Sequence, residues 1–258
     1  MPKDETTDAH ARTTSETIDL LLNRVSVRKY SDEPVSDATV EAVLGAAFRA
    51  PTSSNIQAYS VVVVRDEQAR RALSVATGNQ RHVAETPVFL AFCADLTRME
   101  HALQRHGHNM DDNVLEIGLV STIDATLVGM SAYLTAESLG LKGVMIGGVR
   151  NDPLEVARIL GLPRRVYCVF GMCLGWPANV PPQKPRMDYG TVVHHERYRT
   201  EGLADEVDAY DAALAAHYRG QGRETTDDSW SDDINAKFAV PRREKLRQSL
   251  KELGFDFL

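Results

Sequence analysis

Two periodicities of apolar residues divide the chain into expected helices and strands. After Ser36, which can cap a helix, apolar residues recur every three or four positions, as in an amphipathic helix, and a longer, more continuously apolar segment at 113–139 predicts one long helix. Short runs rich in β-branched and aromatic residues, at 59–64, 88–93 and 167–174, predict buried strands. Because strands and helices are interspersed, the pattern indicates an α+β fold, or an α/β fold with a mixed sheet wrapped by helices.

Capping and helix-breaking residues set further boundaries. Asp152 followed by Pro153 is typical of a helix start, and Gly161 of a helix end. Residues 95–112 are polar and carry several histidines, and their pattern predicts no definite element. Other helices are expected at 16–23, 66–77, 203–219, around Trp230 and at 241–253, and a strand running into a glycine turn is expected at 143–148.

The expected helix at 113–139 is apolar around most of its circumference. Such a helix must be buried on several sides, either in a large core or against another subunit. No stretch reaches the roughly 20 consecutive apolar residues of a membrane span. The nearest candidate, 125–136, is flanked by Asp124 and Glu137, so we expect no membrane partner.

The two ends of the chain differ in character. Residues 1–14 lack apolar periodicity and are expected to form a mobile tail. They also lack the apolar core of a signal peptide, which predicts a cytoplasmic location. No linker divides the remainder, so residues 15–258 are expected to form a single domain with a C-terminal helical extension.

The composition is ordinary for a globular protein, with 43% hydrophobic and 25% charged residues. A net charge of −7 argues against nucleic acid as a partner and makes clusters of basic residues more informative. Three cysteines, Cys93, Cys168 and Cys173, lie in apolar runs and match no zinc or redox spacing. We expect them in the core.

Three groups of residues could meet the demands of a bound flavin nucleotide. Its phosphate needs several charge-assisted donors, its ribityl chain needs hydroxyl and amide partners, and its ring needs close backbone. Read separately, each group is more often a solvated surface, an ordinary loop or a turn than a cofactor contact, so spacing alone leaves the function open. The groups are Arg24, Ser26 and Arg28 with Lys184 and Arg186; Ser53, Ser54, Asn55 and Gln57; and Gly147 with Gly148.

The order of these groups resembles that of the FMN-dependent nitroreductase family. RVSVRKY, residues 24–30, resembles the family's opening phosphate-binding motif, and PTSSNIQ, residues 51–57, its second flavin motif. GVMIGGVRND, residues 143–152, resembles its ring-face loop. CLGWPANVPPQKPRM, residues 173–187, is similar to the NADPH-preferring, oxygen-insensitive nitroreductase and flavin reductase branch.

Shorter segments extend the resemblance from about residue 17 to the C-terminus. They are QRHVA at 80–84, FCAD at 92–95 and SWSDDI at 229–234. Each motif alone is degenerate, but the whole series in family order is highly specific.

The resemblance implies a nitroreductase-like fold in an obligate homodimer, with two non-covalent FMN sites at the subunit interface. The long apolar helix independently calls for an additional partner. By the resemblance, the phosphate and ribityl end of FMN is held by Arg24, Val25, Ser26, Arg28, Lys184 and Arg186. The ribityl chain and the polar edge of the ring are reached by Ser53, Ser54, Asn55 and Gln57. The ring itself is approached by Gln80, Met145, Ile146, Gly147 and Gly148, with the Gly148 backbone N–H near N5.

The chain departs from the family pattern in three places. Many relatives carry Arg or His where this chain has Val25, so one phosphate donor is lost or replaced by backbone. Ala58-Tyr59 replaces a common Pro-Trp pair. Thr226-Asp227 stands where the NADPH-preferring branch has an arginine pair for the 2′-phosphate, and Arg223 is the nearby candidate to substitute for it.

The activity that the resemblance implies is an FMN-dependent oxidoreductase using NADPH or NADH. Its acceptors would be small molecules such as nitroaromatics, quinones or free flavin, reduced by two-electron, ping-pong hydride transfer. Because the flavin carries the chemistry, no protein general base is required. We therefore expect no catalytic side chain, and we expect His194 and His195 to be surface groups.

Other functions remain open on the sequence alone. One is a non-enzymatic FMN-binding sensor or storage module, and another is the same fold acting as a reductive dehalogenase or enoate reductase. A metal site is a third, because His101, His106 and His108 lie close together. Their spacing fits no helical ligand pair at three or four residues, so we expect a polar loop and no metal.

Overall fold

The computed structural model describes residues 14–110, 115–222 and 229–257. The expected mobile tail, apart from Thr14, lies outside the described residues. The first described helix, α1 (Glu16–Leu22), is capped by Ser15, whose side chain accepts a hydrogen bond from the Ile18 N–H.

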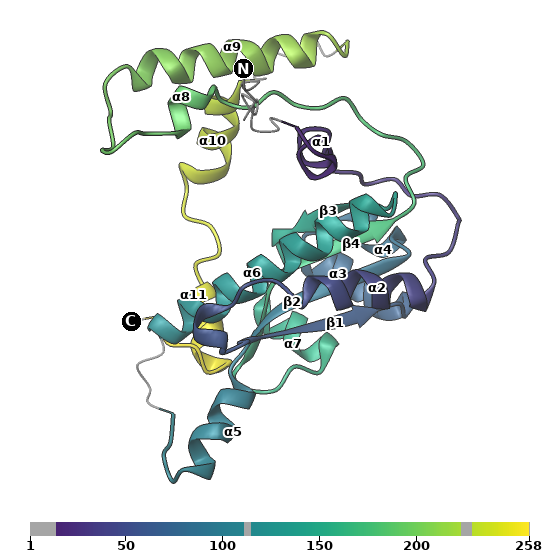
Figure 1. Cartoon of the computed structure of the whole chain (residues 1–258), viewed down its shortest axis with the longest axis vertical. Coiled ribbons are helices and arrows are strands. Elements are labelled where there is room, and N and C mark those ends of the chain that lie inside the picture. Colours follow the sequence, from purple (N-terminus) through teal and green to yellow (C-terminus); the bar gives the residue numbers. More distant parts are fainter. Residues whose placement is uncertain (1–13, 111–114, 223–228, 258) are drawn as a thin grey trace, which may run out of the picture.

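A four-stranded sheet forms the centre of the molecule (Figure 1). Its order is β1-β2-β4-β3, and every pairing among these strands is antiparallel. A register shift at Phe92 and Cys93 interrupts the β2–β4 ladder. The strands are β1 (Tyr59–Val64), β2 (Val88–Asp95), β3 (Lys142–Ile146) and β4 (Val166–Gly175), which confirms the expected strands and the α+β class.

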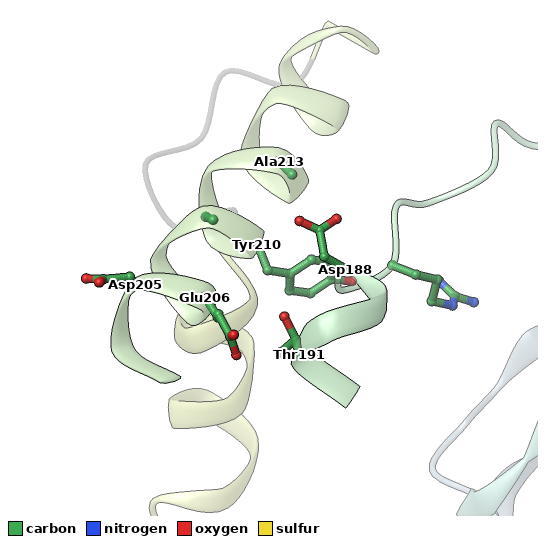
Figure 2. Close-up of a pocket in the computed structure, with 8 residues that line it drawn as sticks. Asp188, Thr191, Asp205, Glu206, Tyr210 and Ala213 are labelled. Carbon is green, nitrogen blue, oxygen red and sulfur yellow. The ribbon is translucent and has the colours of Figure 1, made fainter. Parts of the chain in front are cut away.

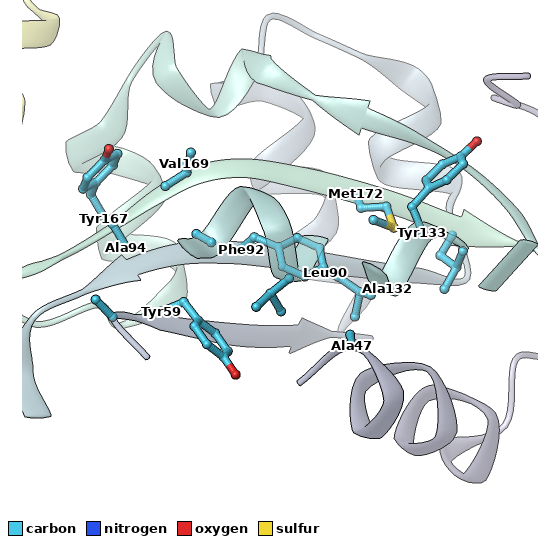
Figure 3. Close-up of a cluster of buried hydrophobic side chains, with 14 of the residues drawn as sticks. Ala47, Tyr59, Leu90, Phe92, Ala94, Ala132, Tyr133, Tyr167, Val169 and Met172 are labelled. Atoms are coloured by element: carbon cyan, nitrogen blue, oxygen red, sulfur yellow. The ribbon is translucent and has the colours of Figure 1, made fainter. Parts of the chain in front are cut away.

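Helices cover both faces of the sheet, and alternate residues of β2 enter the two cores. Leu90 and Phe92 pack with α2 (Asp37–Ala47) and α6 (Leu115–Ser138) in the first core (Figure 3). Phe89, Ala91 and Cys93 pack in the second core with α3 (Glu67–Ala76), α4 (Arg81–Glu85) and α7 (Pro153–Leu160). Because both faces of β2 are buried, its sequence is apolar from Val88 to Ala94 rather than alternating. The three cysteines are buried and free, as expected for core residues.

The helix boundaries follow the capping residues. Ser36, Asp66 and Asp152 each accept a hydrogen bond from a backbone N–H in the first turn of α2, α3 and α7. Gly161 ends α7 with a φ of +65°. The expected helix at 241–253 begins later, as α11 (Leu246–Glu252), because Arg243 has a φ of +56°, which an α-helix does not allow.

The long helix α6 crosses the sheet on its first-core side. At Gly129 an added Cβ would lie 2.3 Å from the Phe170 ring, so glycine permits this close packing. The opposite side of α6 is apolar but exposed, and Asn113, the expected start, lies outside the described residues. By length and composition α6 could cross a membrane, but a buried core helix has the same properties.

The chain leaves the sheet after β4 and returns only at α11. Between them, α8 (Tyr189–Val192), α9 (Leu203–Arg219) and α10 (Trp230–Phe238) stand apart from the sheet (Figure 1). The segment at 95–112, for which the sequence predicted no element, contains α5 (Thr97–Arg105), which projects at the other end of the molecule. Two short 3-10 turns, η1 (Ser53–Asn55) and η2 (Gly147–Arg150), precede β1 and follow β3.

Candidate active site

A basic hollow of about 350 Å³ joins two segments that are far apart in the sequence. Arg24, Ser26 and Arg28 line one side, and Lys184 and Arg186 line the other. None of the described residues that line it is a carboxylate. The structure therefore brings together the five residues that the sequence suggested for a phosphate, and no carboxylate among the described lining residues competes for it.

Backbone contacts hold the two segments side by side. The Gln183 side-chain amide donates hydrogen bonds to the carbonyl oxygens of Leu22 and Arg24, the second at 3.3 Å. The Ala178 N–H donates to the Lys29 carbonyl at 3.0 Å. These contacts fix the basic hollow independently of any ligand.

Lys184 is held by the C-terminal end of α9. Its ammonium donates a hydrogen bond of 2.5 Å to the Tyr218 hydroxyl and lies 4.9 Å from the centre of the Tyr218 ring. Tyr218 itself is only 8% exposed. The excursion formed by α8–α10 thus supports one wall of the basic hollow.

The expected ring-face residues form a second group at the end of β3. A Cβ on Gly148 would lie 2.4 Å from the Gln80 amide nitrogen and 2.5 Å from the Thr77 carbonyl oxygen. Gln80 donates a hydrogen bond of 2.8 Å to that same carbonyl. Two residues suggested by separate motifs are therefore in direct contact, with glycine allowing the approach.

The residues before the glycines face in alternating directions. Met145 is 38% exposed, whereas the Ile146 side chain is 1% exposed and lies in the second core. Ile146 can therefore offer only its backbone to a ligand. Val25 is similar in the basic hollow, because its side chain is 7% exposed.

The hydroxyl-rich loop at 53–57 does not reach the basic hollow of its own chain. Asp124 on α6 fixes this loop, accepting hydrogen bonds from the Ser53 N–H at 3.0 Å and the Ala58 N–H at 3.1 Å. The side chains of the loop are exposed, and Ser54, Asn55 and Gln57 have positive φ angles of 47°, 55° and 54°. Within one chain, these predicted ribityl contacts stand apart from the predicted phosphate contacts.

Two further hollows border the basic one. An open cleft of about 940 Å³ shares Arg28 and is lined by Arg70, Arg81 and His82. Burial lowers the pKa of His82, and the charge of Arg28 lowers it further, whereas Glu85 opposes the shift. The third hollow, of about 250 Å³, lies between α8 and α9 (Figure 2). It carries the carboxylates of Asp188, Asp205 and Glu206, which do not suit an anion.

Two residues near these groups, Arg243 and Tyr133, were not predicted from the sequence. Arg243 donates hydrogen bonds to the Gly147 carbonyl at 3.2 Å and to the Asn151 side chain at 3.0 Å. Tyr133, on α6, lies beside Arg24, whose guanidinium is 5.6 Å from the centre of its ring. The basic pair Arg242-Arg243 was a sequence signal that could have identified Arg243. The sequence around Tyr133 holds no such signal.

Some predictions fall outside the described residues or stay untested. Arg223 and Thr226-Asp227, the candidates for nicotinamide recognition, lie outside the described residues. His101 lies on α5, and His106 and His108 follow it, all exposed. Among the described residues, no group of three histidine, cysteine or carboxylate side chains could hold a metal ion.

Two protein-family models match the chain. The model of the nitroreductase family matches residues 21–176, and that of the nitroreductase family C-terminal domain matches residues 184–258. Between the two matched ranges lies the proline-rich segment 177–183, which enters the basic hollow.

Individual relatives match over almost the whole chain. An oxygen-insensitive NADPH nitroreductase from Salmonella typhimurium is 39% identical over 245 residues, covering 93% of this chain and 98% of the relative. An FMN reductase (NADPH) from Bacillus subtilis is 34% identical, with the same coverage of 93% and 98%. The solved structure of NADPH:FMN oxidoreductase from Vibrio harveyi, complexed with NAD⁺, matches at a TM-score of 0.84 and 34% identity, covering 93% of this chain and 99% of that one. The expected nitroreductase-like fold is thereby confirmed, and the chain belongs to the nitroreductase family.

Proposed function

We propose that this protein is an FMN-dependent oxidoreductase that takes electrons from NADPH or NADH and reduces nitroaromatics, quinones or free flavin. The observation that carries the proposal is the basic hollow, where Arg24, Ser26 and Arg28 meet Lys184 and Arg186. The named activities of the nitroreductase and FMN reductase relatives support it. They do not favour a flavin store, a dehalogenase or an enoate reductase.

The residues present fit FMN on the chemistry of their side chains. A phosphate dianion is best held by several charged donors, each contributing about 1.5–3 kcal/mol net. The basic hollow supplies four cationic side chains and the hydroxyls of Ser26 and Tyr218, without a carboxylate in its described lining. At Gly148 the missing Cβ lets the η2 backbone pack directly against Gln80 and the Thr77 carbonyl, which places the two expected ring contacts, Gln80 and the Gly148 backbone, side by side.

Each group of residues has a different task in this proposal. When bound, FMN would accept a hydride from the reduced nicotinamide and pass the electron pair to the acceptor in a second half-reaction. The basic hollow would anchor the phosphate, and Gln80 and the backbone of Gly147 and Gly148 would orient the ring, with the Gly148 N–H near N5. Preorganised backbone donors of this kind stabilise developing negative charge without reorganisation. No side chain is assigned as a general acid or base, and His194 and His195 have no role in the proposal.

We further propose that the protein acts as an obligate homodimer. Leu115, Leu119, Ile123 and Leu127 form an apolar stripe at four-residue spacing along α6, each between 38% and 55% exposed. Such a stripe is typical of an interface. A second copy packed there would also bring another 53–57 loop, which does not reach the basic hollow of its own chain. In this arrangement, Ser53, Ser54, Asn55 and Gln57 would serve the partner's flavin.

The dimer proposal is tested by sedimentation. We expect the native protein to sediment as a dimer, and Ile123→Glu, which places a charge in the stripe, to sediment as a folded monomer with weakened FMN binding. Val63→Glu is the control, because Val63 is 40% exposed on β1, away from the stripe. A native monomer that still binds FMN would exclude the shared site. The single domain at 15–258 and the cytoplasmic location stay predictions.

The flavin spectrum tests the central proposal. The purified protein, reconstituted with FMN if necessary, should show a flavin band that bleaches anaerobically on addition of NADPH or NADH. The band should return with nitrofurazone or a quinone, and comparing the two donors gives the nicotinamide preference. A bound flavin that neither donor reduces would indicate a binding module. Failure to bind FMN after reconstitution would exclude the proposed function.

A further inference from the structure

The phosphate-binding segment alternates between buried and outward-facing residues. Val25 and Val27 are 7% and 0% exposed, whereas Arg24, Ser26 and Arg28 line the basic hollow. This period of two is that of an extended chain, and the Val27 N–H donates to the Gly143 carbonyl of β3 at 3.0 Å. The segment can therefore offer only three side chains to a ligand, and Arg24 is one of its two cations.

The Arg24 side chain is positioned rather than free. Its Nη1 lies 3.5 Å from the Tyr133 hydroxyl and 3.4 Å from the Ser26 hydroxyl. The guanidinium also lies 5.6 Å from the centre of the Tyr133 ring, within the range of a cation–π interaction. A flexible arginine held in its binding geometry loses less conformational entropy when the ligand arrives.

Tyr133 is itself held by the backbone on both sides of the site. Its side chain is 1% exposed on α6, and its hydroxyl lies 2.9 Å from the Val25 carbonyl and 3.2 Å from the Gly143 carbonyl. Burial and the nearby Glu137 carboxylate raise the pKa of Tyr133 to about 12. The hydroxyl therefore keeps its proton at neutral pH, donating to a backbone carbonyl while its lone pairs remain available to Arg24.

We infer that Tyr133 is a positioning residue, which holds Arg24 against the basic hollow and thereby makes the site select flavins that carry a phosphate. The inference rests on the proposed function, and it explains how the segment binds phosphate with the apolar Val25 in its middle. Tyr133 itself does not line the basic hollow, whereas Arg24 does, so its effect on the ligand passes through Arg24.

The test compares flavins with and without a phosphate. The Kd of the apoprotein for FMN and for riboflavin is measured by flavin fluorescence quenching. Tyr133→Phe keeps the ring but removes the hydroxyl. We expect it to raise the Kd for FMN about five- to tenfold and to leave the Kd for riboflavin within about twofold.

Tyr167→Phe is the matched control. Tyr167 is also a buried tyrosine, 4% exposed, with its hydroxyl 2.5 Å from Thr122 Oγ1. Figure 3 shows Tyr133 and Tyr167 at opposite ends of the same core. Removing the Tyr167 hydroxyl should change neither Kd, although it also removes a hydrogen bond of a core tyrosine.

A double-mutant cycle with Arg24→Gln separates positioning from general support of the fold. If Tyr133 acts through Arg24, adding Tyr133→Phe to Arg24→Gln weakens FMN binding no further. Additive losses, or equal losses for FMN and riboflavin, would overturn the inference. Should Tyr133→Phe fail to fold, Arg24→Gln alone decides, since unchanged discrimination between the two flavins would also overturn it.

The proposed function fails separately. It is lost if the native protein binds no FMN. If the native protein binds FMN and riboflavin equally well, only the positioning inference is lost.

Discussion

The Arg243 guanidinium donates a hydrogen bond of 3.2 Å to the carbonyl oxygen of Gly147. This contact ties the segment before α11 to the turn η2, at the edge of the proposed ring site. Burial lowers the pKa of Arg243, and the neighbouring charges of Arg150 and Arg242 lower it further. A guanidinium nevertheless stays protonated at neutral pH, so Arg243 places a positive charge next to the backbone that would face the flavin.

Removing this contact should impair turnover more than folding. Arg243→Ala frees the η2 backbone, so the donors aimed at the ring are less preorganised. We expect kcat/KM for NADPH oxidation at saturating FMN to fall about tenfold, which corresponds to about 1.4 kcal/mol. Arg242→Ala, which removes the same charge from an exposed neighbour, is the control. An equal fall in both variants would show that net charge, and not the hydrogen bond, is responsible.

The two glycines of the ring-face turn should respond differently to substitution. A Cβ on Gly148 would meet Gln80 at 2.4 Å and the Thr77 carbonyl, which is backbone, at 2.5 Å. A Cβ on Gly147 would meet only the end of the Arg150 side chain, at 3.1 Å, and no backbone. Gly148→Ala should therefore reduce the free energy of unfolding of the apoprotein by about 1–3 kcal/mol, whereas Gly147→Ala should change it by less than about 1 kcal/mol. Urea denaturation measures both, and equal effects would contradict the expected close packing at Gly148.

Local sequence patterns predicted the helices and strands that are determined by a few neighbouring residues. The strand β1 is indicated by a run of β-branched residues, and the start of α7 by a capping residue followed by proline. Each signal occupies only a few consecutive residues. The helix α5 was not predicted, because its contact with the first core consists mainly of two partly buried residues, Met99 and Leu103, which are four positions apart. Two apolar positions in a polar segment are too few to distinguish a helix from a loop.

The site was predictable only as separate pieces. Motif order suggested that residues 24–28 and 184–186 serve one ligand, and the structure brings them to one hollow. The contacts of Tyr133 and Arg243 join positions about 100 residues apart, and each depends on how the chain packs in three dimensions. The Tyr133 hydroxyl is hidden in an apolar helix, where a tyrosine is expected for its ring alone.

The pKa of His82 should report the arrival of phosphate. In the apoprotein, burial and Arg28 hold this pKa below its ordinary value of about 6.5. The unfolded chain therefore binds the proton more readily, and the contribution of His82 to stability is present above about pH 6.5 and lost as the pH falls below it. FMN should raise the pKa of His82, because its phosphate offsets the charge of Arg28.

An NMR titration of the imidazole measures this shift, with His82→Asn to assign the signal. Riboflavin is the control, since it lacks the phosphate and should leave the titration midpoint in place. A midpoint that FMN does not move would place the phosphate away from Arg28.

Removing both cations of the 184–186 segment should abolish retention of FMN. Lys184 and Arg186 face the three residues of the opposite wall, and a charge-assisted hydrogen bond contributes about 1.5–3 kcal/mol. Lys184→Ala combined with Arg186→Ala should raise the Kd for FMN at least 100-fold, because each lost bond costs at least about 1.4 kcal/mol, which is a factor of ten in Kd. Flavin absorbance after dialysis provides the measurement. Lys237→Ala with Lys251→Ala removes the same charge from two surface ion pairs, with Asp233 and Asp256, and should retain FMN. Unchanged occupancy in the Lys184 and Arg186 double variant would move the phosphate out of the basic hollow, because no other described residues on that wall could replace two cations.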